Sequence, residues 1–304
     1  MSILTALLLL CASLAPSVAR QDATPVSGFA NLGLPTMELT VTGDGYEGVP
    51  ESVEAGRYLV TLSASEDSPE GGTVSFVQPS GLSPEEFLAT LSDQSEATPV
   101  ATAEASPGAS PVAAAPTASF DAIWAGGTFA ESGQTSQVVV DLTPGEWLVY
   151  GESPTDEPTV FKATGEMPAD LPEPEASAAL ATDEYAIEVT SGELTAGQQI
   201  IKVENVGQQP HFISGDLGPA GVTSDQVGAA FEGAAMGTPA PDGFDPSTDL
   251  TTVFYTATQS PGTVTWHVID LEPGTYVLAC FYPDEQDGMP HASHGMYTVI
   301  EIAE

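Results

Sequence analysis

Four residues near the C-terminal end of the sequence have the types and spacing of a soft-metal site. They are Cys280, His291, His294 and Met296, within the segment LEPGTYVLACFYPDEQDGMPHASHGM. A thiolate, an imidazole and a thioether are three of the four ligands of a mononuclear copper site that transfers electrons. The fourth ligand, a second imidazole, must come from elsewhere in the fold. Of the two other histidines in the sequence, His211 follows an apolar strand pattern and is the candidate.

Other readings of these residues stay open. His291 is favoured over His294 as the ligand because of its spacing and because Pro290 stiffens its approach. His294 would then be an exposed imidazole or support the site from outside. Cys280 could instead be a buried thiol that packs as a small apolar residue. His211 could be an ordinary histidine of a surface loop.

The charge balance excludes some partners. Four Lys and Arg residues stand against 43 Asp and Glu residues in 304 residues, a formal net charge of −39. Nucleic acid is excluded as a natural partner, because phosphate binding needs cationic side chains. The charge favours solubility in a secreted or salt-adapted protein and leaves open a cationic redox partner.

The N-terminus has the pattern of an export signal. Residues 4–14 are almost entirely apolar, and Ser17-Val18-Ala19 is a small-residue cleavage site, so we expect a signal peptide over 1–19. No later segment is long and apolar enough to span a bilayer. We therefore expect a secreted protein, in the periplasm or at the cell surface. Its only remaining cysteine is Cys280, which has no disulfide partner in the chain, and a bound metal accounts for such a thiol.

Composition divides the rest of the chain into two β-rich units. We expect a flexible lead-in over 20–34, a β unit over 35–165 with a disordered Ala/Pro insertion near 95–119, a linker over 166–182, and a second β unit over 183–304. A short helix is predicted in each unit, at 83–88 and at 223–232, where Ser or Thr precedes the first turn.

The two units repeat each other. Residues 141–149 (DLTPGEWLV) match residues 270–278 (DLEPGTYVL), which places Cys280 opposite Gly151. The first unit contains no histidine and no cysteine, so it lacks every candidate ligand. Short strands at even spacing predict an all-β fold of two tandem antiparallel Greek-key β-sandwiches, each with one short helix.

Two segments resemble the ligand regions of cupredoxins, the type 1 blue copper proteins. LTAGQQIIKVENVGQQPHF resembles their first ligand region, and TYVLACF with PHASHGM resembles their second ligand loop. The resemblance covers about residues 185–303, and the second loop resembles that of secreted bacterial cupredoxin-like proteins. A fainter resemblance, without ligands, extends over the first half. The cupredoxin resemblance implies a Greek-key sandwich and one type 1 copper ion. The ligands that it implies are His211 and His291 as imidazoles, Cys280 as thiolate and Met296 as axial thioether.

The sequence departs from the cupredoxin pattern in the second loop. Ten residues separate Cys280 from His291, more than in the small cupredoxins, and three of them are acidic: Asp284, Glu285 and Asp287. These acids could tune the potential of a copper ion or bring in a different metal. Phe212 also stands where small cupredoxins have an asparagine that braces the cysteine loop.

The function that these observations favour is an exported one-electron carrier with an unidentified redox partner. A metal-free binding or structural module is the alternative, because the first half already lacks ligands. Copper delivery or storage ranks third, since few methionines lie near the site. Catalysis is not expected: four histidines cannot build a second copper centre beside a type 1 site, and the common catalytic motifs are missing from the sequence.

Overall fold

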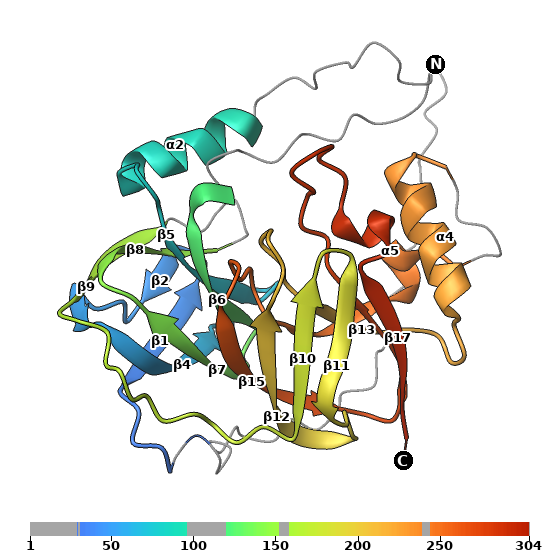
Figure 1. Ribbon diagram of the computed structural model, residues 1–304, viewed down its shortest axis with the longest axis horizontal. Helices are drawn as coiled ribbons and strands as arrows, with labels where there is room; N and C mark the ends of the chain where they lie inside the picture. The colour runs from blue at the N-terminus through green and yellow to red at the C-terminus, as the bar shows by residue number, and fades with distance from the viewer. Residues whose placement is uncertain (1–28, 30, 96–119, 152–157, 239–243, 304) are drawn as a thin grey trace, which may run out of the picture.

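The computed structural model describes residues 29, 31–95, 120–151, 158–238 and 244–303 (Figure 1). The predicted signal peptide, most of the lead-in and nearly all of the Ala/Pro insertion lie outside the described residues. Of the lead-in, Phe29 is described, and its ring is buried against Leu59 and Trp266.

Strands dominate both halves of the chain. The first half contains β1 (Thr36–Thr42), β2 (Gly45–Glu47), β3 (Ser52–Glu54), β4 (Gly56–Ala64), β5 (Gly72–Gln78), β6 (Ile123–Ala130), β7 (Thr135–Leu142), β8 (Gly145–Tyr150) and β9 (Thr159–Thr164). The second contains β10 (Ala178–Asp183), β11 (Ala186–Gly192), β12 (Gly197–Asn205), β13 (Ser214–Leu217), β14 (Thr251–Tyr255), β15 (Val264–Leu271), β16 (Gly274–Ala279) and β17 (Tyr297–Ile302).

The strands form two sandwiches that share one sheet. An eight-stranded sheet has the order β11-β10-β12-β15-β7-β4-β1-β2 and runs through both halves. Its first-half strands pack on the sheet β3-β9-β8-β5-β6, and its second-half strands pack on the sheet β14-β13-β16-β17. The predicted all-β fold of two sandwiches is confirmed. The halves join where β15 pairs with β7, with Trp266 opposite Val139 and His267 opposite Val138.

Purely antiparallel pairing was expected, but the structure also contains parallel pairs: β3 with β9 in the first half, and one equivalent pair in each half. β1 pairs with β4 in parallel, and β10 pairs with β12 in parallel. A short hairpin explains the equivalent parallel pair in each half. β2 runs antiparallel along one edge of β1, and β11 runs antiparallel along one edge of β10. The chain then returns along the opposite edge of β1 or β10 as β4 or β12, in the same direction as that strand.

The helices begin where the sequence predicts but are longer and more numerous. In α2 (Pro84–Ser95), Ser83 and Glu86 form reciprocal capping hydrogen bonds. α4 (Ser224–Ala235) has the same capping box between Thr223 and Gln226. The predicted short helix is present in each half. The second half also holds the four-residue α5 (Pro246–Asp249), which Asp245 caps, and the 3-10 turn η2 (His291–His294).

Strand β10 lies where a linker was expected. Its sequence, AALATD, is rich in alanine, which has little preference for strands, so composition alone did not reveal it. Pairing decides the structure instead, because β10 is hydrogen-bonded to β11 on one side and to β12 on the other. Ala178, Leu180 and Thr182 alternate inward, as a strand with one buried face requires.

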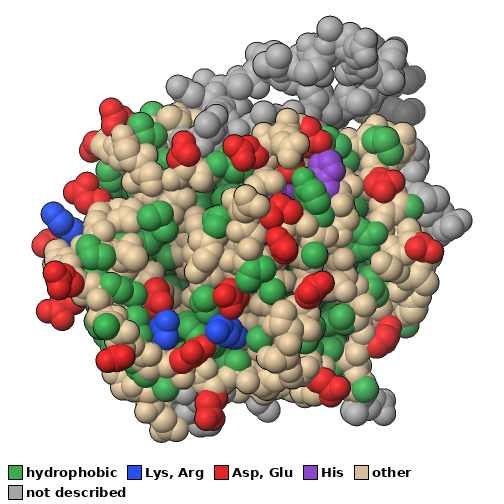
Figure 2. All heavy atoms as spheres, viewed as in Figure 1, with side chains coloured by type: hydrophobic (Ala, Val, Ile, Leu, Met, Phe, Trp, Pro, Cys, Tyr) green, Lys and Arg blue, Asp and Glu red, His purple; other side chains and the backbone are tan. Residues whose placement is uncertain are grey.

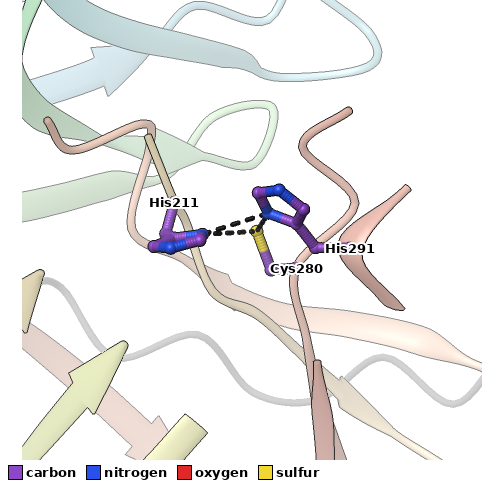
Figure 3. A group of neighbouring side chains, drawn as sticks. All are labelled: His211, Cys280 and His291. Atoms are coloured by element: carbon purple, nitrogen blue, oxygen red, sulfur yellow. Dashed lines mark hydrogen bonds between the residues drawn. The ribbon is translucent and has the colours of Figure 1, made fainter. Parts of the chain in front are cut away.

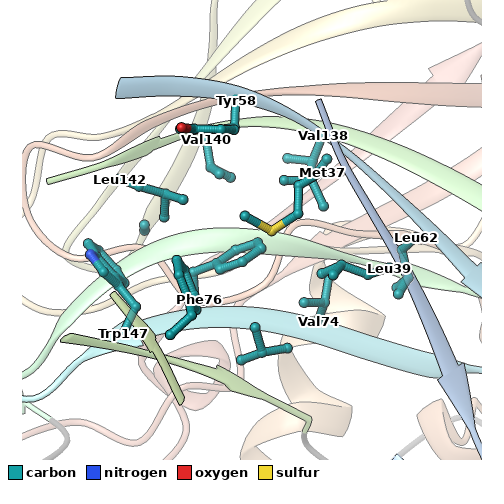
Figure 4. Packing of buried hydrophobic residues seen from close by; sticks show 14 of the residues in the cluster. Met37, Leu39, Tyr58, Leu62, Val74, Phe76, Val138, Val140, Leu142 and Trp147 are labelled. Carbon is teal, nitrogen blue, oxygen red and sulfur yellow. The ribbon is translucent and has the colours of Figure 1, made fainter. Parts of the chain in front are cut away.

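Each sandwich has its own apolar core. Figure 4 shows the first, in which Met37 and Leu62 of one sheet face Phe76 and Trp147 of the other. The second core contains Ile201, Ile269 and Tyr276, and it also takes in Cys280 and Met296. The two candidate sulfur ligands are therefore parts of a sandwich core, which limits their motion.

Cationic side chains from both halves meet at the joint between the sandwiches. Arg57 of β4 lies 4.4 Å from the ring centroid of Trp266 on β15, and Lys202 of β12 lies 5.8 Å from it. Arg57 also donates to both carboxylate oxygens of Asp141, at 2.7 and 2.8 Å, and to the Pro172 carbonyl at 3.0 Å. The cation–π contact of Arg57 with Trp266 therefore crosses the joint, and the paired hydrogen bonds to Asp141 fix the guanidinium from its own half.

Replacing Arg57 by methionine should weaken this joint. The Arg57→Met variant keeps an apolar stem but leaves Asp141 without its charged partner, so we expect a loss of about 1–3 kcal/mol in the free energy of unfolding. Urea denaturation measures it. Lys162→Met removes an exposed cation from β9 and is the matched control for net charge. An equal loss in both variants would contradict a specific role for Arg57.

A buried carboxyl in β13 should make stability depend on pH. Burial raises the pKa of Asp216, although the hydroxyls of Ser214 and Thr252 both donate to its Oδ1 atom. The folded protein thus holds this proton more tightly than the unfolded chain. Ionisation therefore costs stability above the folded-state pKa, and the cost disappears as pH falls.

The Asp216→Asn variant keeps an oxygen that can accept both hydroxyl hydrogen bonds. We expect it to raise the free energy of unfolding by on the order of 1 kcal/mol near pH 8. The gain should shrink on acidification, because wild-type Asp216 is then protonated. Thermal melts of both proteins from pH 4 to pH 8 test this, and a gain that grew towards acid pH would contradict it.

Candidate metal centre

Three donor atoms from separate segments meet in the second sandwich (Figure 3). His211 Nδ1 lies 3.1 Å from His291 Nδ1, and Cys280 Sγ lies 3.9 Å from the first nitrogen and 3.7 Å from the second. All three side chains are completely buried. The three atoms thus form a small triangle in a part of the core that excludes water.

His211 is held by a bridge to a neighbouring segment. Its amide donates to the Gln259 carbonyl at 3.0 Å, and the Gln259 amide donates back at 2.8 Å. The side-chain amide nitrogen of Asn205, at the end of β12, donates to the carbonyls of Gln209 and Gln259, both at 2.8 Å. Asn205 therefore links the segment before His211 to the neighbouring segment that bridges to it.

Cys280 directly follows β16, and His291 and Met296 lie further along the loop that begins there. The Cys280 amide donates to the Met296 carbonyl at 3.1 Å, and the Ala292 amide donates to the Cys280 carbonyl at 2.7 Å. His291 opens η2, and its amide donates to the Tyr282 carbonyl at 2.9 Å. Met296 has no exposed surface and belongs to the same apolar cluster as Cys280.

The triangle has the dimensions that a soft metal ion requires. Metal–nitrogen bonds of about 2.0 Å and a metal–sulfur bond of about 2.3 Å, at angles of roughly 100–130°, separate the donor atoms by about 3.1–3.9 Å. The three measured separations fall within that range. The donor set of two imidazoles and a thiol also fits copper or zinc better than magnesium or calcium.

Burial keeps all three donors neutral in the absence of a cation. It raises the pKa of the Cys280 thiol to about 12 and lowers the pKa of His211 to about 4. Burial lowers the pKa of His291 to about 4 as well, with help from the neighbouring His211. A metal ion would replace the thiol proton, and the Phe212 amide, 3.5 Å from Sγ, would then donate to the thiolate.

Oxygen acceptors face the outer nitrogen of each imidazole. His291 Nε2 lies 3.4 Å from Gln209 Oε1 and 3.7 Å from Asp284 Oδ2, and His211 Nε2 lies 3.5 Å from Glu184 Oε1. Gln209 is within hydrogen-bond distance of His291 Nε2, whereas His211 Nε2 has no hydrogen-bond partner among the described residues and only the charge of Glu184 beside it. Both arrangements favour a proton on Nε2, which leaves the Nδ1 lone pairs directed at the triangle.

Asp284 is the acid of the long loop that comes closest to a candidate ligand. It is buried, and burial alone would raise its pKa, but hydrogen bonds from Gln209, Tyr185 and the Gln286 amide lower it to about 2. Asp284 therefore stays ionised beside His291. The sequence suggested that acids in this loop could act on the metal, and this geometry places one of them near a ligand.

The structure brings together His211, Cys280 and His291, and Met296 is buried beside them; their role as ligands stays a prediction. His294 lies apart, with its side chain 31 % exposed and Nε2 3.2 Å from Asp287. His267 is buried elsewhere, with Nε2 2.7 Å from Thr265 Oγ1.

A second group, Asp284, Asp287 and His294, is close enough to share an ion. Asp287 and His294 are exposed, and exposed acids commonly lie together without one.

Sequence reasoning missed the residues that surround the donors. Gln209, Glu184, Tyr185 and Gln259 all touch the site or hold a candidate ligand. Gln209 lies within the segment that resembles the first ligand region, whereas Glu184, Tyr185 and Gln259 reach the site only through the folding of another strand or loop. The one available signal was the proximity of Gln209 to His211 in the sequence.

The chain is similar to several solved structures of copper proteins. No family model matches the chain, and no curated protein matches it. Reduced auracyanin from Roseiflexus castenholzii is 22 % identical, with 41 % of this chain and 95 % of that chain covered, at a TM-score of 0.27. The azurin of Methylomonas sp. strain J is 15 % identical over 41 % of this chain and 96 % of its own, at 0.26.

A longer similarity covers both halves. Copper nitrite reductase from Nitrosomonas europaea matches 88 % of this chain and 94 % of its own, with 11 % identity and a TM-score of 0.22. Scores at this level assign no function to the present chain. Among the described residues, no helix is long and apolar enough to cross a membrane.

Gly207 should be necessary for the geometry of the site. A Cβ atom there would lie 2.7 Å from Glu184 Oε1 and 2.9 Å from His211 Nε2. We expect Gly207→Ala to displace the imidazole and weaken zinc binding by roughly 10-fold or more, measured by competition with a chromophoric chelator. Gly56→Ala is the control, because its Cβ would meet nothing closer than 3.9 Å. Equal affinities would show that His211 is not a ligand.

Proposed function

We propose that this protein is an extracytoplasmic one-electron carrier with a single type 1 copper ion. His211, Cys280 and His291 are its main ligands, and the Met296 thioether is the weak fourth. The observation that carries the proposal is the buried triangle of two Nδ1 atoms and one Sγ atom, with sides of 3.1, 3.7 and 3.9 Å.

Copper supplies a one-electron couple between its two common oxidation states, and a rigid site of two imidazoles and a thiolate suits both. The chain contributes rigidity. Cys280 and Met296 are fixed in the second core, and the carbonyl of Met296 accepts the Cys280 amide hydrogen bond. His211 is fixed by Gln259. Little rearrangement is therefore needed when the charge at the site changes.

The donor set favours copper over a structural zinc ion. Structural zinc sites use four strong ligands, from cysteine and histidine. Among the residues that the structure describes, three such donors converge, and the buried fourth candidate is a thioether, a soft ligand that suits copper. The nearby carboxylates of Asp284 and Glu184 face the outer Nε2 atoms of the imidazoles.

Two further expectations belong to this proposal. Export rests on the signal pattern of residues 1–19. The absence of catalysis rests on the histidines: His267 and His294 lie outside the triangle, so the chain has no further set of imidazoles for a second copper centre. The redox partner is unidentified, and the net charge of −39 favours one that is cationic.

The visible spectrum tests the proposal directly. The mature protein loaded with one equivalent of Cu(II) should show an intense thiolate-to-copper charge-transfer band, and Cys280→Ser should abolish it. His291→Gln should also lose the band, because it removes one of the three donor atoms. His294→Gln is the matched control and should keep it.

Two results would contradict the proposal. One is a wild-type protein that loses copper during dialysis against a mild chelator, as a metal-free binding module would. The other is a band that survives in Cys280→Ser. Retention of the band in His291→Gln together with its loss in His294→Gln would move the ligand to the alternative histidine.

A further inference from the structure

The turn between β10 and β11 reaches both imidazoles of the candidate centre. Asp183 pairs with Ala186 across this hairpin, so the turn consists of Glu184 and Tyr185. The side chain of Glu184 is directed to one imidazole and that of Tyr185 to the other. Neither residue is on the strands or loops that supply the candidate ligands.

Glu184 approaches His211. Its Oε1 atom accepts hydrogen bonds from the amides of Gln208 at 2.6 Å and Gln209 at 2.9 Å, and it lies 3.5 Å from His211 Nε2. The two amides fix the carboxylate in place, so a negative charge is held against the outer edge of the ring.

Tyr185 approaches His291. The two ring centroids are 5.8 Å apart at an angle of 75°, and the Tyr185 hydroxyl donates to Asp284 Oδ2 at 2.8 Å. That same carboxylate oxygen is 3.7 Å from His291 Nε2. The Tyr185 ring is also 5.1 Å from the exposed His294 ring. Tyr185 is half-buried and packs against the fully buried His291, so it covers that imidazole from the hairpin side. Figure 2 shows histidine atoms at the surface beside acidic side chains.

The backbone of Tyr185 makes this position unusual. Its φ angle is +65°, in the left-handed region, which is unfavourable for a residue with a Cβ and which glycine adopts readily. Among the described residues, Ala257 is the other non-glycine with positive φ, two positions before Gln259, which holds His211. Strain of this kind persists where the surrounding structure requires it.

The first half provides an internal comparison. β1 pairs with β2 and β4 as β10 pairs with β11 and β12, and the corresponding turn consists of Gly43 and Asp44, between Thr42 and Gly45. The half without ligands thus has small residues at this turn. The half with ligands has two large side chains there, one of them strained.

We propose that Glu184 and Tyr185 are positioning residues of the metal centre, each holding one imidazole in place. Glu184 orients His211 and adds negative charge to it. Tyr185 orients His291 through Asp284 and closes the centre to water on the side of His294. This inference rests on the proposed function, because it assumes that a metal is bound at His211, Cys280 and His291.

The test measures how fast a chelator removes zinc, and separately copper, from the protein. Tyr185→Gly and Glu184→Gln should each lose metal 10–100-fold faster than the wild type, as expected when groups that orient a ligand are removed. Tyr185→Phe keeps the ring but loses the hydroxyl that donates to Asp284, so it should lose metal at a rate between those of the wild type and Tyr185→Gly. The metal-free Tyr185→Gly protein should unfold at nearly the wild-type urea concentration, because relief of the strained φ offsets the lost ring contacts.

The reduction potential is a second readout, which a purely structural role would not change. Loss of the Glu184 charge should favour Cu(I) over Cu(II) by about tenfold, a rise of about 59 mV. Glu188→Gln, on an exposed position of β11, is the matched charge control. Tyr46→Leu removes a tyrosine from the corresponding hairpin of the first half and controls for general destabilisation.

The outcomes separate the two proposals. If the wild type binds neither metal through Cys280, the proposed function and this inference both fail. If the wild type binds copper with a thiolate band but Tyr185→Gly and Glu184→Gln behave as Glu188→Gln and Tyr46→Leu do, only the inference is overturned. A Tyr185→Gly protein that fails to fold would leave Tyr185→Phe and Glu184→Gln to decide, and wild-type retention in both would refute it.

Discussion

The close approach of three neutral donors in a dry core is the constraint on which the rest of the second sandwich depends. Two imidazoles and a thiol within 3.9 Å of one another give up their hydrogen bonds to water, and a buried polar group without a partner is costly. A bound metal ion would give the three donor atoms a bonding partner and so remove this cost. The features around the triangle all serve to hold it: the Gln259 bridge, the Asn205 hydrogen bonds and the closure of the cysteine loop on Met296.

The ligandless half contributes to the site from a distance. Its strand β6 reaches the segment that holds His211, because Ala125 bridges to Gln259 and the Trp124 amide donates to Ser260 Oγ at 2.9 Å. Phe120 packs edge-on against Tyr282, whose ring lies 6.2 Å from that of His291. With the shared eight-stranded sheet, these contacts make the first half a support for the ligand segment. That role explains how it can keep the fold without a ligand.

The sequence predicted the parts of this arrangement that depend on residue type and spacing. Cys280 and His291 share one loop, and His211 follows an apolar strand pattern, so the sequence alone indicated their chemistry. β10 was missed because alanine carries no strand preference and only pairing with β11 and β12 determines its structure. Glu184 and Tyr185 were missed for the same reason, since they reach the site only when that hairpin forms.

The two equivalent hairpin turns differ in how well their residues suit the conformation of the turn. Both halves build the same hairpin and the same parallel return, so the scaffold tolerates either turn. In the first half the turn follows local preference, with glycine at its start. In the second half a tyrosine occupies a left-handed conformation beside a buried imidazole. Of two equivalent turns, the one beside the donor atoms contains the unfavourable residue. The fold does not require that residue, so its contacts at the site explain it better.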